Sequence, residues 1–323
     1  EITGIQSAST GKTIKGWFVA CPYTPQRMVS LPEKRVYNKI IATGHLTERL
    51  GAKILGLGAY TSVVGDAGLT IAQSMNIPVT TGDSYTVDMA VQAVRKAAQA
   101  MQIDVSTARA AVVGATGTIG RVCAEILAEE VAHLTLVGRR PDALETVRAQ
   151  CAAGGRAVLA TSTDIASIYD ADLVLTVTST IESVIEPQHL KPGAVVCDVA
   201  RPRDVSKRVA QLRDDVLVIE GGMVAVPGPV DFHFDFGFPP RMAYACMAET
   251  MALALEGRYE DYSLGKQITR EQVREISEIA GRHGFELGYF RSYERGPVTD
   301  EHIALVREKA TQARRTWSPV GVS

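Results

Sequence analysis

The sequence is poor in three features that would narrow its function directly: cysteine, net charge and long apolar runs. It has only five cysteines among 323 residues, they are widely spaced, and none forms a Cys-x-x-Cys pair. This pattern argues against a disulfide framework or a zinc site and is typical of the reducing cytoplasm. We therefore predict a cytoplasmic protein without a metal centre.

The small net charge and the lack of long apolar runs exclude further classes. A formal net charge of −2 gives the chain no general attraction to nucleic acid or anionic membranes. No apolar run approaches the roughly 20 residues that a membrane-spanning helix needs, and no signal-peptide pattern is visible. We predict no nucleic-acid partner and no transmembrane segment. Because the sequence starts at Glu1 rather than Met, a missing or processed natural N-terminus stays open.

What the chain does contain is a strand–turn–helix pattern centred on three glycines. Four apolar residues at 110–113 predict a buried strand, and apolar residues at helical spacing follow the glycines. In such a unit the glycines permit a tight turn, a close approach to pyrophosphate and helix–strand packing, while the helix N-terminus faces the phosphates. We predict a dinucleotide site here; a tight turn that binds nothing is the alternative. The predicted cofactor-binding residues are Gly114, Ala115, Thr116, Gly117, Thr118, Ile119 and Gly120.

The middle third of the chain predicts a Rossmann-type, doubly wound parallel sheet and hence an α/β fold. Apolar segments alternate mostly with helical or loop crossovers, which implies a sheet covered on both faces. The segments lie at 110–113, 134–137, 157–160, 173–177, 194–198 and 216–219. Thr178, Ala200 and Gly222 follow the ends of three of them and are also predicted to contact the cofactor.

Arg139 and Arg140 lie about 20 residues beyond the glycine turn, after the second predicted strand. An NAD site usually carries Asp or Glu at this point, where the carboxylate binds the ribose hydroxyls. Two arginines suit the 2′-phosphate of NADP instead, since a guanidinium binds phosphate through paired hydrogen bonds. We therefore predict NADPH as the cofactor; two solvated arginines at the start of a helix are the alternative.

Residues 1–104 predict a separate α/β substrate domain, ahead of the NADP-binding domain at 105–229 and a C-terminal helical segment at 230–323. Within the first domain, the loop 60–68 and the turn 81–84 follow apolar strands, at the edge where open α/β sheets bind ligands. We predict substrate-binding side chains in these two segments, with glycine-dependent turns and helix capping as the alternative. The residues concerned are Tyr60, Ser62, Asp83 and Ser84.

Alternating aromatic and polar residues occupy positions 230–238. They predict a strand or extended loop that covers an apolar surface; the sharper alternative is the wall of a pocket for an apolar tail. A lone histidine in such a run more often has a structural role than acts as a general acid or base, and we expect the same of His233.

A helix is predicted from Pro239 to about Glu256, with Gly257 as its stop. It would place Cys246 in its second turn, and the N-terminal half of a helix favours a thiolate. By position alone Cys246 is an ordinary core cysteine, with a nucleophile as the minor alternative. Two more helices are predicted after it.

Several blocks of the sequence resemble the long-chain acyl-(acyl-carrier-protein) reductases, NADPH-dependent enzymes that form fatty aldehydes and are best known from cyanobacteria. The most distinctive block is 240–249 with 255–257, which contains Cys246, whereas many reductases share the glycine motif. The remaining blocks are 30–35, 57–64, 80–84, 114–120 and 220–222. Wider relatives are dehydrogenases of the shikimate type, which also have a separate substrate domain before the nucleotide domain.

The resemblance implies that Cys246 takes the acyl group as a thioester, and that hydride from NADPH then gives an aldehyde. It implies an acyl carrier protein or CoA thioester as substrate, with an aldehyde-consuming enzyme as a candidate partner. Neither the acyl length nor the oligomeric state follows from it. The oxyanion donor stays open among Ser62, Ser84 and backbone N–H groups.

The chain departs from the cyanobacterial pattern at its start, in the run 230–238 and in an extension over 286–323. These differences fall where acyl length and carrier recognition could be set. Two other functions stay open. One is a shikimate-dehydrogenase-like oxidoreductase acting on a small alcohol or keto acid, for which Lys53 and Asp83 would supply a Lys–Asp pair. The other is a non-catalytic NADP-binding sensor or scaffold.

Overall fold

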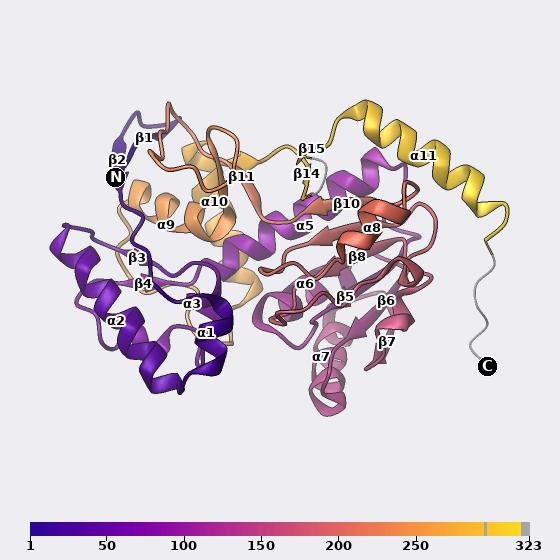
Figure 1. Ribbon diagram of the computed structural model, residues 1–323, viewed down its shortest axis with the longest axis horizontal. Coiled ribbons are helices and arrows are strands. Elements are labelled where there is room, and N and C mark those ends of the chain that lie inside the picture. The colour runs from indigo at the N-terminus through magenta and orange to yellow at the C-terminus, as the bar shows by residue number, and fades with distance from the viewer. Residues whose placement is uncertain (294–295, 318–323) are drawn as a thin grey trace. The chain divides into compact units, whose positions relative to one another are not determined.

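The computed structural model describes residues 1–293 and 296–317 and divides into two compact units (Figure 1). The N-terminal unit comprises Glu1–Met89 and Gly222–Gly288, and the sheet unit comprises Ala90–Gly221 and Tyr289–Ser323. Within the described ranges, no helix has both the length and the apolar character to cross a membrane.

The sheet unit is built on six parallel strands, in the order β10-β9-β8-β5-β6-β7. In chain order this is the 3-2-1-4-5-6 arrangement of dinucleotide-binding folds, in which the strand order reverses beside the first strand. The predicted Rossmann-type sheet is confirmed. The strands are β5 (Arg109–Val113), β6 (His133–Val137), β7 (Val158–Ser162), β8 (Leu173–Thr176), β9 (Val195–Asp198) and β10 (Leu217–Glu220).

The central strands of this sheet are buried on both faces, as expected where helices and crossovers cover a parallel sheet, whereas the edge strand β7 is partly exposed. All four residues of β8 and of β9 are buried, for example. The connecting elements are α6 (Thr118–Ala128), α7 (Pro141–Gly154), η1 (Ile165–Ile168), η2 (Pro187–His189) and α8 (Lys207–Leu212). After β10 and the excursion into the N-terminal unit, the sheet unit ends with β14 (Arg291–Ser292), β15 (Gly296–Pro297) and α11 (Asp300–Arg314).

The N-terminal unit combines the first part of the chain with the segment after β10. Its early elements are β1 (Ile2–Gln6), β2 (Thr13–Gly16), α1 (Pro25–Ser30), α2 (Glu33–Arg49), β3 (Leu55–Gly56), α3 (Tyr60–Val63), α4 (Leu69–Ala72) and β4 (Val79–Thr80). Its later elements are β11 (Met223–Ala225), β12 (Met242–Tyr244), α9 (Ala245–Glu256), α10 (Arg270–His283) and β13 (Glu286–Leu287). One apolar core joins both stretches, with Ile5, Tyr85, Ala245 and Ile279 among its members.

The compact units do not coincide with the predicted segments 1–104, 105–229 and 230–323. Helix α5 (Asp83–Ala100) begins in the N-terminal unit and continues in the sheet unit. The C-terminal segment is not a body of its own, because α9 and α10 share the core of the N-terminal unit and α11 belongs to the sheet unit. The last six residues of the 286–323 extension lie outside the described part of the chain.

The structure decides one open prediction in the C-terminal third and corrects another. Residues 232–238 form a loop, one of the two predicted alternatives, because Asp231 and Asp235 accept hydrogen bonds from the N–H groups two residues further on and fold the backbone into turns. Helix α9 begins at Ala245, not near Pro239, because residues 242–244 pair with β11 as strand β12. Cys246 is therefore the second residue of its helix.

Candidate active and cofactor sites

The glycine turn after β5 has the geometry that only glycine allows. Gly114 has φ +86°, and a Cβ there would lie 2.7 Å from the carbonyl oxygen of Val177. A Cβ on Gly120 would lie 2.3 Å from the carbonyl oxygen of Gly114, so a side chain would push α6 away from β5. The steric roles predicted for these two glycines are therefore supported by the backbone.

The N-terminus of α6 is free to receive an anion. Gly117 is the N-cap and offers no side-chain cap, and the first N–H groups of a helix have no intrahelical partners. The turn also follows the carboxyl end of β5, whose neighbours are β6 and β8, beside the point where the strand order reverses. This cradle fits the pyrophosphate of a dinucleotide.

The two arginines predicted to select NADP follow β6 and are exposed. Arg140 is the N-cap of α7. Neither Arg139 nor Arg140 forms an ion pair or a side-chain hydrogen bond within the described residues, so both guanidinium groups are available for a phosphate.

The other three residues predicted to contact the cofactor, Thr178, Ala200 and Gly222, already have hydrogen-bond partners within the protein. The Thr178 hydroxyl donates a short hydrogen bond to the buried Asp204, and the Ala200 N–H donates to Asp198 Oδ1 at 3.0 Å. Both residues follow sheet strands as expected, but these groups already have protein partners. Gly222 belongs to the N-terminal unit, where its carbonyl accepts from the Ala245 N–H at 2.8 Å. These contacts to a cofactor stay predictions.

A second site is built around Cys246 in the first turn of α9. Gly82 packs directly on it: a Cβ on Gly82 would lie 2.2 Å from the Cys246 Cα. Gly82 has φ +77°, so both its conformation and its neighbour exclude a side chain. A backbone hydrogen bond from Ala59 reaches the Cys246 sulfur. The loop after β3 and the turn after β4 therefore meet at this thiol.

Two buried carboxyl groups, Asp83 and Glu249, accompany Cys246. Glu249 has no exposed surface; it accepts hydrogen bonds from the Thr80 hydroxyl and from the Tyr85 N–H, the latter at 2.8 Å. These bonds tie α9 to the segment that carries Gly82. Glu249 is not among the site residues predicted from the sequence; its only signal there is a glutamate three residues after Cys246 in a mostly apolar helix.

Burial raises the pKa of both acids above the usual range of a carboxyl group. Burial, reinforced by the charge of Glu249, raises the pKa of Asp83 to about 8. Burial also raises the pKa of Glu249, against the hydrogen bonds from Thr80 and Tyr85 that favour its ionised form. At neutral pH Asp83 is thus mainly a neutral acid that can donate a proton.

The partly exposed Cys246 is a thiol at rest. Desolvation raises its pKa from 9.0 to about 11, with further increases from Asp83 and Glu249 and an opposing effect of the Ala59 hydrogen bond. A rise of two pKa units corresponds to about 2.7 kcal/mol, more than the ~1 kcal/mol typical of a helix terminus. The N–H of Met247, in the first turn of α9, favours the thiolate as expected, but burial outweighs it.

The other predicted substrate residues divide between this site and the supporting structure. Asp83 lies beside Cys246, whereas Ser84 is fully buried and accepts a hydrogen bond from Ser263 at 2.7 Å. Ser62 donates to the Ala59 carbonyl at 2.8 Å. Asp83 and Ser84 are the first two residues of α5, not its N-cap. Tyr60 opens α3 and is partly exposed.

The Lys–Asp pair of a shikimate-type site is not formed. Lys53 is exposed, and its Nζ lies 5.6 Å from the ring centre of Tyr259. Asp83 is buried beside Cys246 and makes no ion pair with Lys53 in the described structure. This arrangement disfavours the shikimate-type alternative.

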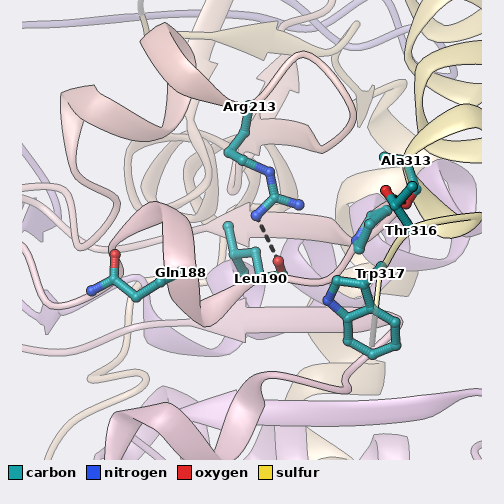
Figure 2. Close-up of a pocket in the computed structure, with 7 residues that line it drawn as sticks. Gln188, Leu190, Arg213, Ala313, Thr316 and Trp317 are labelled. Carbon is teal, nitrogen blue, oxygen red and sulfur yellow. Dashed lines mark hydrogen bonds between the residues drawn. The ribbon is translucent and has the colours of Figure 1, made fainter. Parts of the chain in front are cut away.

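A cavity of about 390 Å³ in the sheet unit lies away from the strand ends that carry the cofactor residues. Figure 2 shows Arg213 reaching into it, hydrogen-bonded to the Leu190 carbonyl oxygen at 2.6 Å, with Trp317 nearby. Arg213 and Leu190 precede β10 and β9, so this cavity lies at the amino ends of the strands. The guanidinium also pairs with Asp215, which makes its role here structural.

The similarity to known proteins differs between the glycine turn and the Cys246 site. A family model described as shikimate/quinate 5-dehydrogenase matches residues 95–220, which include the glycine turn but neither Lys53 nor Cys246. The chain is 30% identical over 295 residues to the long-chain acyl-[acyl-carrier-protein] reductase of Synechococcus elongatus, covering 87% of this chain and 84% of that protein.

Other similarities are more limited. The chain is 29% identical over 290 residues to the aminotransferase PigE of Serratia sp., covering 89% of this chain. It spans only about a third (34%) of PigE. The structure of a dipicolinate synthase from Bacillus halodurans matches with a TM-score of 0.37 and 19% identity, covering 43% of this chain and 47% of that one. That structural similarity is too low to add to the fold argument.

The strand order, the glycine turn and these relatives define an oxidoreductase with a Rossmann-type dinucleotide-binding unit. More specifically, the chain belongs to the long-chain acyl-[acyl-carrier-protein] reductase family, and the family resemblance seen in the sequence is confirmed. The family relationship supports NADP(H) as the cofactor.

Proposed function

We propose that this protein reduces an acyl thioester to an aldehyde with NADPH, through an acyl group carried on Cys246. The observation that carries the proposal is the construction of the Cys246 site. A partly exposed thiol lies in the first turn of α9, with Gly82 packed on its backbone and Ala59 hydrogen-bonded to its sulfur.

In the first step, the Cys246 sulfur attacks the carbonyl carbon of the incoming thioester. A carbon–sulfur bond forms to Cys246, the bond to the carrier sulfur breaks, and the carrier leaves as a thiol with the proton that Cys246 gives up. Backbone N–H groups near Ala59 and at the start of α9 are the proposed oxyanion donors. The Ser62 hydroxyl is less suited because it donates to the Ala59 carbonyl, and the Ser84 hydroxyl because it is fully buried.

When bound, NADPH supplies the hydride for the second step, and the reduced carbon takes a proton on its oxygen. The carbon–sulfur bond to Cys246 then breaks, which releases an aldehyde and restores the thiol. We propose the neutral carboxyl of Asp83 as the local proton source, since burial holds its pKa near 8. The net reaction consumes one thioester, one NADPH and one proton.

The proposed substrate is a thioester of acyl carrier protein or CoA, and an aldehyde-consuming enzyme is the proposed partner. The named reductase relative acts, by its name, on acyl groups of acyl carrier protein. The cytoplasm remains the proposed location, in keeping with cysteines that show no disulfide among the described residues.

The acyl-enzyme is tested by intact-mass measurement after incubation with acyl-CoA or acyl carrier protein, without NADPH. Wild type should gain one acyl group and Cys246→Ala none. Cys21→Ala is the matched control, because Cys21 is the other partly exposed cysteine, and this variant should be labelled like wild type. An unmodified wild type, or equal labelling of Cys246→Ala, would refute the covalent mechanism.

The cofactor assignment is tested by replacing Arg139 and Arg140 with alanine. Because both guanidiniums are assigned to the 2′-phosphate, affinity for NADPH should fall roughly tenfold or more, while affinity for NADH should barely change. Fluorescence titration of both cofactors gives the two dissociation constants. An equal loss for NADH and NADPH would refute the role of these arginines.

A further inference from the structure

The loop 230–238 forms an array of aromatic rings whose role the proposed function leaves open. We call Phe18, Phe232, Phe234, Phe236, Phe238 and Tyr244 the aromatic array. All six lie in the N-terminal unit. Sequence alternation suggested one aromatic face of a strand, but the rings converge from a loop, from β12 and from the segment after β2.

The rings of the array form a continuous path. Starting from Tyr244, ring centres are separated by 4.3 Å to Phe238, then 5.2 Å to Phe236. Phe236 lies 5.3 Å from Phe18 and 5.1 Å from Phe232. Phe234 completes the path at 6.2 Å from Phe18. These spacings are those of packed aromatic pairs.

One end of the path adjoins the candidate nucleophile. Tyr244 is the N-cap residue of α9 and precedes Cys246 by two positions. Phe236 and Met247 pack against the same apolar core as Ala245, the residue just before Cys246. The array therefore ends two residues before Cys246 in the chain and packs against the core that the first residue of α9 also joins.

The other end of the path is open to solvent. Phe234 is 64% exposed and Phe18 is 39% exposed. Single exposed aromatic residues are common, but two in ring contact, at the end of a path whose other rings are buried or partly buried, form an exposed apolar patch. The aromatic path thus runs from the start of α9 to the surface of its unit.

We infer that the aromatic array binds the hydrocarbon chain of the acyl group on Cys246, and that its exposed rings set the preference for chain length. The inference rests on the proposed function. An extended hydrocarbon chain matches the array because it needs a long, narrow apolar surface and no polar partners. Each methylene that it buries should raise kcat/KM about fourfold, the equivalent of ~0.8 kcal/mol.

The test compares wild type with the double variant Phe18→Ala/Phe234→Ala across saturated acyl-CoA substrates from butyryl to palmitoyl. Both rings are exposed, so the variant should fold, which circular dichroism verifies. Palmitoyl-CoA should lose roughly tenfold or more in kcat/KM, the worth of about two buried methylenes. Butyryl-CoA should stay within twofold. Leu212→Ala, at a similarly exposed apolar residue of the sheet unit, should change neither value.

Three other outcomes would overturn the inference. An unchanged chain-length profile would mean that the rings do not contact the acyl chain. An equal loss for butyryl and palmitoyl substrates would assign the patch to docking of the carrier or another partner. Failure of wild type to acquire any acyl group, even butyryl, would refute the proposed function itself. Wild-type acylation by butyryl-CoA therefore separates failure of the inference from failure of the proposed function.

Discussion

Replacing Asp83 by asparagine gives the sharpest test of the carboxyl cluster beside Cys246. Asp83 is 9% exposed, and burial together with the charge of Glu249 raises its pKa to about 8. In the unfolded chain the pKa of an aspartate is about 3.9. The folded protein therefore holds this proton more tightly than the unfolded chain, and asparagine keeps the shape of the side chain without titrating.

The sign and size of the effect follow from proton linkage. Between pH 4 and 8 the folded state binds more protons at Asp83 than the unfolded state, so this group makes stability fall as pH rises. Its contribution is complete below the unfolded pKa and is lost as the pH passes the folded pKa. The slope approaches 1.4 kcal/mol per pH unit, hence about 2.7 kcal/mol between pH 5 and 7. The Asp83→Asn variant should lack this loss.

The assay is urea denaturation followed by tryptophan fluorescence at pH 5 and pH 7. The sequence has two tryptophans, and in a Trp317→Phe background the remaining Trp17 reports on the N-terminal unit. Relative to its parent, Asp83→Asn should gain stability on going from pH 5 to 7. Asp235→Asn, the same change at an exposed position of that unit, should affect both pH values equally. If Asp83→Asn has the same pH dependence as its parent, Asp83 is ionised in the folded protein.

Three further predictions concern the two sites. Glu249→Ala should destabilise the protein by about 3 kcal/mol in urea denaturation, because it leaves the buried donors of Thr80 and Tyr85 without their acceptor; no loss would mean that water replaces the carboxylate. Alkylation of Cys246 by iodoacetamide should accelerate about tenfold per pH unit from pH 8 to 10, since its pKa is about 11; a plateau below pH 9, seen by peptide mass spectrometry, would contradict this value. Gly120→Ala should abolish most NADPH binding in a fluorescence titration, because its Cβ would meet the Gly114 carbonyl at 2.3 Å. Its control, Gly281→Ala, adds a Cβ in open space and should bind normally.

The sheet unit was predictable because its signals are local. Buried parallel strands are continuous apolar runs, and the glycine turn joins one such strand to a helix within a few residues. All six predicted strands agree with the structure to within about two residues, the usual uncertainty of element ends. Helix α10, one of the two helices predicted after Glu256, begins at a capping box that Thr269 forms with Gln272.

The N-terminal unit was less predictable because its organisation depends on contacts distant in sequence. Nothing near residue 230 indicates that the following helices share a core with residues 1–89. The start of α9 was misplaced because residues 242–244 pair with β11 instead of extending the helix. The raised pKa of Cys246 was missed for the same reason, since the burial that causes most of it and the charge of Asp83 come from segments distant in the chain.

The two units have different roles: the sheet unit binds the cofactor, and the N-terminal unit holds the proposed reacting groups. The match to shikimate/quinate dehydrogenases is confined to residues 95–220, so the sheet unit accounts for the dinucleotide but is shared by enzymes with other chemistry. The N-terminal unit lacks a Lys53–Asp83 ion pair within its described residues and instead has a thiol beside two buried carboxyl groups, and burial raises the pKa of Asp83 to about 8. A thiol in that setting suits transient acylation better than direct oxidation of an alcohol, because it supplies a nucleophile and a proton source rather than a base for the hydroxyl. We therefore propose that the side chains of the N-terminal unit determine the reaction type, whereas the glycine turn only binds the cofactor.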